Sequence, residues 1–218
     1  MNSSIKKALV LSMALVLCFV FYGCGKEEES PTKVADEFLK SIKNSDQDAI
    51  KKVYKGKAFD PFAALKLFED DNESGSPDSY VSKDLLPKAK EFDYKISEEK
   101  IDGDKATVNV KITSYNIAGF MVNWITDYMQ TASEQFADST PDDSQMEQML
   151  KESYENQKST LKKDLKKDVK LNLVKDDGKW KVNTLKKNDE LFNAINGGVI
   201  DLSKKIAEDL ENSENGED

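Results

Sequence analysis

The chain has 218 residues, of which 38% are hydrophobic and 33% are charged, and its formal net charge is −9. This length allows one sizeable domain with a packed core, or two small ones. Histidine and arginine are absent, and all 32 basic residues are lysine. The composition excludes an imidazole base, histidine metal ligands and Ser-His or Cys-His nucleophile pairs, and the negative charge argues against nucleic-acid binding.

The N-terminus has the pattern of an export signal that ends at a cysteine. Lys6 and Lys7 precede an apolar segment, residues 8–22. As a helix this segment would reach about 22 Å, short of the ~30 Å hydrocarbon core of a bilayer. Gly23 precedes Cys24, and this pair resembles the lipobox of bacterial lipoproteins. The resemblance implies that the Cys24 thiol receives a diacylglyceryl group and that cleavage leaves Cys24 as the first residue.

The lipobox resemblance predicts both the N-terminal segments and the location of the protein. Residues 1–23 would be a lipoprotein signal peptide, and residues 24–30 a polar tether. The alternative is an uncleaved helix that anchors the chain, with an incidental cysteine. Either way the remainder lies at the outer face of the cell membrane. The two cysteines, Cys18 and Cys24, both precede the folded region, which therefore has no thiol for a disulfide or a zinc site.

The first predicted elements beyond the tether are helices. Ser30-Pro31 has the residue types of a helix N-cap and first helical position, and the apolar stripe in residues 34–42 continues that helix. A second short helix follows at residues 49–54, and a third begins at Asp60-Pro61. Residues 81–92 contain a proline, which limits any helix there to short pieces.

Two hairpins are predicted in the second half of the chain. Apolar residues alternate in residues 92–96 and 106–112, on either side of an Asp-Gly-Asp turn. The same alternation returns in residues 169–182, around an Asp-Asp-Gly turn. These segments predict antiparallel strands with one buried face.

Helical periodicity separates the two hairpins and follows the second. Residues 117–165 predict a helical pair that packs beside or over the sheet. A last helical segment, residues 191–210, is interrupted at Gly197-Gly198, which predicts a helix break or a close backbone contact. The polar residues 211–218 predict a disordered tail.

This order of elements resembles the nuclear transport factor 2-like fold, also called cystatin-like, and the closer resemblance is to uncharacterised lipoproteins of Gram-positive bacteria. The resembling segments are PTKVADEFLKSIKNSDQDAIKKVY (Pro31–Tyr54), ATVNVKIT (Ala106–Thr113), the hairpin VKDDGKWKVN (Val174–Asn183) and LFNAINGGVIDLSKK (Leu191–Lys205). The resemblance implies a single α+β domain over residues 31–210. Its N-terminal helices would pack on a curved, cone-shaped antiparallel sheet, with a two-helix insertion and a C-terminal helix. It implies no known activity.

One acidic loop partly matches a calcium-binding pattern. Asp70, Asn72, Ser74 and Asp78 occupy positions 1, 3, 5 and 9 of an EF-hand loop. Position 12, where a bidentate glutamate belongs, is Val81. A solvated acidic loop without a bound ion is therefore the preferred interpretation, and weak extracellular calcium binding is the alternative.

The strands offer aromatic residues but no acid–base pair. Trp180 is expected to pack against the helices, and ligand stacking is its alternative role. Tyr94, Tyr115 and Asp93 lie near the strands that line the pocket in enzymes of this fold class. No two carboxylates are placed so that one could act as acid and the other as base, so no catalytic residue and no cofactor is predicted.

The apolar stripe in residues 117–136 has three interpretations. It could be core, a groove-binding surface or a helix that lies on a membrane. Core is preferred, because its opposite face is not basic. Met121, Met129, Met146 and Met149 lie in the same helical pair, either as an adaptable surface or as irregular packing.

The leading functional hypothesis is a non-enzymatic, lipid-anchored extracytoplasmic domain that binds a small molecule or a protein partner at the cell envelope. The alternatives are an envelope enzyme or accessory factor that uses the cone pocket, and a structural surface module without a specific ligand. A carboxyl–tyrosine pair deep in a roomy cone would favour the enzyme. A cone filled by the protein's own side chains, with an exposed apolar patch on the helices, would favour protein binding.

Overall fold

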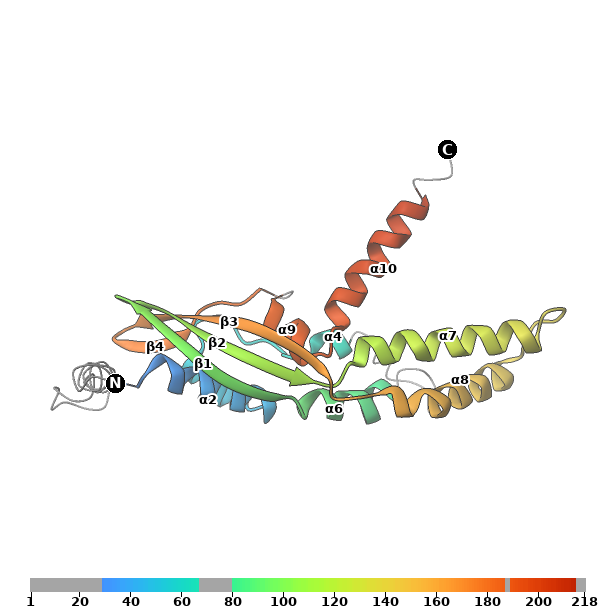
Figure 1. The fold of residues 1–218 in the computed structure, drawn as a ribbon, viewed down its shortest axis with the longest axis horizontal. Coiled ribbons are helices and arrows are strands. Elements are labelled where there is room, and N and C mark those ends of the chain that lie inside the picture. The colour runs from blue at the N-terminus through green and yellow to red at the C-terminus, as the bar shows by residue number, and fades with distance from the viewer. Residues whose placement is uncertain (1–28, 67–79, 187–188, 215–218) are drawn as a thin grey trace, which may run out of the picture.

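A four-stranded antiparallel sheet in the order β1-β2-β3-β4 runs through the structure, a computed structural model that describes residues 29–66, 80–186 and 189–214 (Figure 1). The strands are β1 (Asp93–Asp102), β2 (Lys105–Ser114), β3 (Leu165–Asp176) and β4 (Lys179–Val182). β1 pairs with β2, and β3 with β4, across the two predicted turns. Both predicted hairpins are confirmed.

Helices cover one face of the sheet and extend beyond one of its ends (Figure 1). They are α2 (Pro31–Lys43), α3 (Gln47–Val53), α4 (Ala63–Lys66), the π-helical turn η1 (Val81–Leu85), α6 (Leu86–Lys90), α7 (Ile117–Gln135), α8 (Asp143–Gln157), the 3-10 turn η2 (Lys158–Thr160), α9 (Glu190–Ile195) and α10 (Val199–Glu214). Ser30 caps α2 as predicted, because its Oγ accepts a hydrogen bond from the Lys33 N–H at 3.2 Å. The α+β class is confirmed.

At the C-terminal end, the last helix runs past the predicted end of the domain. Helix α10 continues to Glu214, so the boundary expected at residue 210 lies inside a helix. The last residues of the predicted tail, 215–218, lie outside the described residues, and so does the segment 1–28, which contains the predicted signal peptide and most of the tether.

The hydrophobic core lies between the sheet and helices α2 and α9. Inward-facing residues of β2 and β3, such as Val108, Ile112 and Leu171, are fully buried. They pack in one core cluster with Phe38 and Leu39 of α2. The alternation of apolar and polar residues in these strands produces this arrangement, because it places most of the apolar side chains on one face. Burial of that face is the main favourable term in folding.

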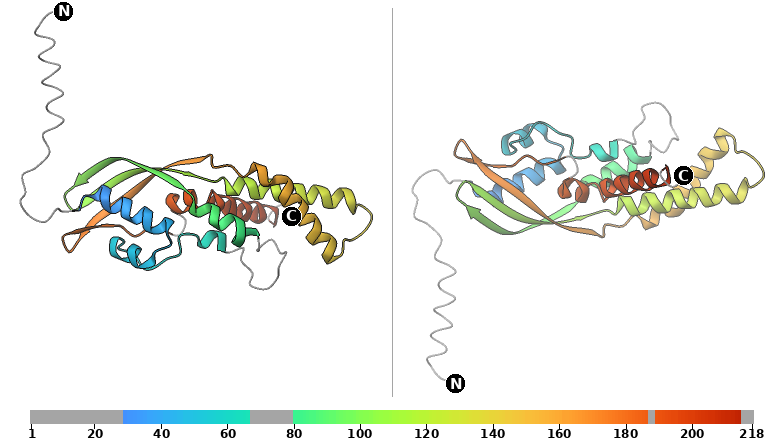
Figure 2. Two further views of the ribbon diagram at one scale, coloured as in Figure 1. Left: turned by 90° about the horizontal axis from the view of Figure 1, so that it is seen from below. Right: turned by 90° about the horizontal axis from the view of Figure 1, so that it is seen from above.

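Helices α7 and α8 form an arm that projects beyond one end of the sheet (Figures 1 and 2). The prediction that this pair packs beside or over the sheet is wrong. β2 ends at Ser114, which pairs with Leu165 at the start of β3. The two helices therefore replace the turn between β2 and β3, and such an insertion extends the hairpin past the edge of the core. Helix α2 begins at the opposite end of the molecule (Figure 1).

The corner between α9 and α10 touches the base of the arm, and glycine is required there. Gly197 has φ +67°, and its carbonyl accepts a hydrogen bond from the Ala118 N–H at 2.9 Å. A Cβ on Gly197 would lie 2.5 Å from the carbonyl oxygen of Tyr115 and 2.8 Å from Cβ of Ile117. The predicted helix break and close backbone contact are both confirmed.

Substituting this glycine should destabilise the protein more than the same change in a turn. We expect Gly197→Ala to lower the free energy of unfolding by about 3 kcal/mol, because left-handed strain adds to a steric clash with backbone. Gly103→Ala is the matched control: it has φ +57° but open space around it, and should cost about 1 kcal/mol. Urea unfolding followed by tryptophan fluorescence measures both. Equal losses would contradict the close contact.

Candidate functional site

Two of the predicted sites lie outside the described residues. Cys24 belongs to the undescribed N-terminal segment, and the acidic loop with Asp70, Asn72, Ser74 and Asp78 lies in the undescribed range 67–79. Elsewhere, in the described ranges, no three Cys, His, Asp or Glu side chains are grouped so that they could hold a metal ion. None of the helices in those ranges is long and apolar enough to cross a bilayer.

The inside of the curved sheet is filled by the protein's own side chains. Phe38 and Ile42 of α2 and Ile195 of α9 are fully buried in the same cluster as Val108 and Leu171 of the sheet. The short helices α2 and α9 thus occupy the space that a ligand would need in a cone-shaped fold. A site for chemistry or binding must be sought elsewhere on the molecule.

The three strand residues predicted near a pocket do not converge on one. The Tyr94 hydroxyl donates a hydrogen bond to Asp36 Oδ1 at 2.8 Å, and burial together with this bond raises the pKa of Tyr94 above its usual range. Asp93 pairs instead with Lys163 at 2.5 Å. Tyr115 lies below Lys88, whose Nζ is 5.0 Å from the ring centroid. These separate contacts stabilise the sheet edges and provide no shared site for an acid and a base.

Trp180 has the packing role that its place in the hairpin predicts. Its side chain is 7% exposed and belongs to the core cluster. The Nζ of Lys175, on the paired strand, lies 5.3 Å from the ring centroid, which fits a cation–π contact. The indole is thereby covered on its outer side, and the packing interpretation is confirmed.

The long stripe of α7 divides into a buried and an exposed face. Phe120 and Trp124 are buried against α8, but Ile125 and Met129 are 52% and 61% exposed. At 3.6 residues per turn, Ile125 and Met129 point about 120° and about 160° around the helix from the direction midway between Phe120 and Trp124. Val122 points the same way and is also exposed. The interpretation of the whole stripe as core is therefore wrong for Ile125 and Met129.

Val122, Ile125 and Met129 form one exposed apolar row along the arm, called here the α7 row. The arm as a whole is acidic, since α7 and α8 together carry six carboxylates and one lysine. These are Asp127, Glu134, Asp143, Glu147, Glu152, Glu155 and Lys151. A surface with these properties can hold an apolar helix face whose flanks are basic. It is poorly suited to an anionic membrane, which attracts lysine-rich surfaces.

An aromatic cluster fixes the arm to the body. Tyr154 of α8 stacks on Tyr80 with ring centroids 4.4 Å apart, and meets Phe120 and Trp124 edge-on at 5.4 and 5.2 Å. The Tyr154 hydroxyl donates to Asp84 Oδ2 at 2.8 Å, and the Trp124 indole N–H donates to the Leu150 carbonyl at 3.1 Å. The arm is thus held in one orientation by side chains from α7, α8 and η1.

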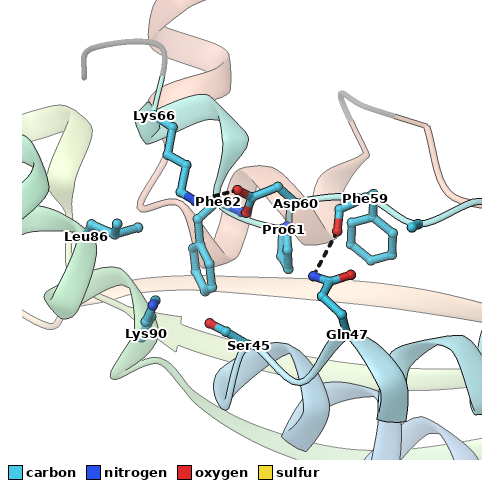
Figure 3. A pocket seen from close by; sticks show the side chains of 10 residues that line it. Ser45, Gln47, Phe59, Asp60, Pro61, Phe62, Lys66, Leu86 and Lys90 are labelled. Carbon is cyan, nitrogen blue, oxygen red and sulfur yellow. Dashed lines mark hydrogen bonds and ion pairs between the residues drawn. The ribbon is translucent and has the colours of Figure 1, made fainter. Parts of the chain in front are cut away.

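Two hollows lie on either side of the segment 58–62, and sequence reasoning missed both. The first, of about 530 Å³, is shown in Figure 3. Its walls are largely fixed by polar contacts: Gln47 donates to the Phe59 carbonyl at 3.1 Å, and Asp60 pairs with Lys66 at 2.8 Å. The second, of about 630 Å³, lies between this segment, α9 and α10, and its lining is mostly apolar.

Comparison with known proteins adds one distant structural likeness. No protein-family model matches the chain, and no curated protein matches it. A crystal structure of the Bacillus subtilis protein ycdA, provisionally described as a lipoprotein, aligns with a TM-score of 0.42 and 16% identity, over 89% of this chain. The chain spans 60% of the length of that structure. This likeness is too weak to assign fold or function, and the nuclear transport factor 2-like resemblance stays a prediction.

Removing the Tyr154 hydroxyl should loosen the arm. We expect Tyr154→Phe to lower the free energy of unfolding at pH 7 by about 1.5 kcal/mol, because a hydrogen bond to a carboxylate is lost. Tyr128→Phe, on the neighbouring α7, is the control and should change it by less than about 0.5 kcal/mol. Urea unfolding gives both values.

The same pair of variants tests the ionisation of Tyr154. Burial, and then the bond to Asp84, raise the pKa of Tyr154 above its ordinary value of 10.0. As pH rises, the unfolded chain therefore loses this proton before the folded chain does. The contribution of Tyr154 to the free energy of unfolding is thus complete below pH 10 and declines above it. The decline should be shallower in Tyr154→Phe than in Tyr128→Phe. Identical slopes would mean that the hydroxyl is not held by the fold.

Proposed function

We propose that the protein is a lipid-anchored, extracytoplasmic and non-enzymatic module that binds a partner protein at the cell envelope through the α7 row. The exposed row on a rigid arm carries this proposal. Its three side chains, Val122, Ile125 and Met129, are 46%, 52% and 61% exposed. They are not part of the apolar face that α7 buries against α8. Continuous apolar exposure of this kind is typical of interaction sites.

The position of the arm suits a partner that lies away from the membrane. The lipid on Cys24 would be six residues before Ser30, the cap of α2, so the body would stay close to the bilayer. Helix α2 begins at the end of the molecule opposite to the arm (Figures 1 and 2). An anchor at that end leaves the α7 row free to point outward. This geometry favours a protein partner over the membrane-lying interpretation.

The partner we propose presents a basic amphipathic helix. Its apolar face would cover the α7 row, and its lysine or arginine side chains would lie near the carboxylates of α7 and α8. Charge pairs at the rim of such an interface mainly accelerate association and select partners. Binding should therefore weaken as salt is added, because exposed charges are screened within about 8 Å at 0.15 M ionic strength.

Replacement of the lipidated cysteine tests the anchor. We expect Cys24→Ser to abolish incorporation of a clickable palmitate analogue and to release the protein from the membrane pellet or leave it as an unprocessed precursor. Cys18→Ser is the control and should keep both the label and the location. Mass spectrometry of the extracted protein reads the N-terminus. A mature chain that still begins at Met1 would contradict the lipoprotein proposal.

Polar substitution of the row tests partner binding. We expect the double variant Ile125→Ser and Met129→Ser to capture about tenfold less partner than the unchanged protein when intact envelopes are cross-linked, since two apolar anchors are removed. The control is Ile101→Ser with Ile206→Ser, which removes two other exposed apolar side chains, 55% and 49% exposed. Equal losses in both double variants would show that the capture is non-specific and not directed by the arm.

A further inference from the structure

The hollow beside α9 and α10, called here the Asn196 pocket, has the size and lining of a small-molecule site. Its volume is about 630 Å³, within the range of 300–1,000 Å³ usual for such sites. Aromatic walls come from Tyr54, Phe59 and Phe192, and aliphatic ones from Leu185 and Ile200. Phe59 is fixed between the other two rings, with centroid distances of 5.0 and 5.1 Å. The aromatic part of the wall is therefore preformed.

One polar group in the lining lacks a partner. Asn196 is fully buried, and its Nδ2 donates to the carbonyls of Pro61 at 2.7 Å and Phe192 at 2.8 Å. These two bonds fix the orientation of the amide. Its Oδ1 is also buried and accepts no hydrogen bond from the described residues. Leaving such an acceptor unpaired costs about 1–3 kcal/mol. Because Oδ1 has almost no accessible surface, a molecule in the pocket reaches it only with a small shift of the lining side chains, and a hydrogen bond donated to it then regains that amount.

The charged side chains at the rim of the pocket already form ion pairs with residues of opposite charge. Asp60 forms an ion pair with Lys66 at 2.8 Å, and Lys204 lies 3.7 Å from Asp201. The hydroxyl of Tyr54 accepts a hydrogen bond from the Leu185 N–H at 3.0 Å. A ligand with a net charge would meet no unpaired countercharge among these residues, which favours a neutral molecule.

We propose that the Asn196 pocket binds a small neutral molecule with an apolar body and one hydroxyl or N–H group that donates a hydrogen bond to Asn196 Oδ1. The aromatic and aliphatic walls hold the body by burial, and the single acceptor selects for the donor. The site is independent of the α7 row, which lies on the arm. Loss of partner binding would leave this proposal intact, and the reverse also holds.

A pair of probes that differ in one group tests the donor. In 4-ethylphenol and 4-ethyltoluene a hydroxyl replaces a methyl of nearly the same size. The full chain in lipid nanodiscs is dialysed to equilibrium against each probe, which fixes the free concentration whatever the lipid absorbs. The methyl resonance of Ile200 reports occupancy. We expect the phenol to bind about tenfold more tightly, although the hydrocarbon is the more apolar of the two.

A pocket-filling variant locates the binding. Ala64 lines the pocket, and Ala64→Phe should remove the response to 4-ethylphenol. The control, Ala49→Phe, makes the same change at a half-buried position of α3 outside this pocket and should keep it. Equal or tighter binding of 4-ethyltoluene would overturn the role of Asn196. Failure of both probes to bind at millimolar concentration, or unchanged binding to Ala64→Phe, would overturn the site.

Discussion

Coverage of the apolar face of the sheet constrains everything else in this structure. Strands β2 and β3 present one face rich in valine, isoleucine and leucine, and that face must be shielded from water. Helices α2 and α9 provide the cover, and their side chains fill the curve of the sheet. Because the curve of the sheet is filled, both proposed binding sites lie at the periphery of the molecule. The exposed α7 row lies outside this core, and the Asn196 pocket lies at its edge, with Tyr54 and Phe192 of the core cluster in its wall.

The arm depends on the same core through its connections. It replaces the turn between β2 and β3, so the paired ends of these strands, Ser114 and Leu165, set its direction. The aromatic cluster around Tyr154 then holds it against η1. A helix pair that is fixed at its base and unpaired along one side can present an apolar row without collapsing onto the body. The excess of acidic residues on α7 and α8 disfavours contact of the arm with anionic lipid.

Local features of the sequence predicted the fold well, because they depend on neighbours in the chain. Ser30 and Pro31 mark the start of α2, and the Asp-Gly turns fix both hairpins. The predicted core of the strands followed from alternation alone. These signals depend on backbone conformation and on the period of the apolar residues, which a single sequence displays directly.

The sites could not be predicted in the same way. Trp124 and Ile125 are neighbours in one apolar stripe and point about 100° apart around the helix. The helical period alone does not show which of the two meets α8 and which is turned toward solvent. The Asn196 pocket joins residues that are more than a hundred positions apart, such as Tyr54 and Leu185. The unpaired Oδ1 of Asn196 depends on where Pro61 and Phe192 lie, and the sequence carries no signal for that.

Photo-cross-linking from the arm in living cells tests the central claim most directly. Benzoylphenylalanine would replace Ile125 on the α7 row, or Ile101 at the end of β1, which is about equally exposed. Ile101 lies two residues after Glu99, whose carboxylate accepts a hydrogen bond from the Thr32 N–H in the first turn of α2. We predict that position 125 yields a discrete protein adduct that weakens with added salt, and that position 101 yields none. Adducts of position 125 with lipid alone, or identical adducts from both positions, would contradict an outward-facing arm that binds a protein partner.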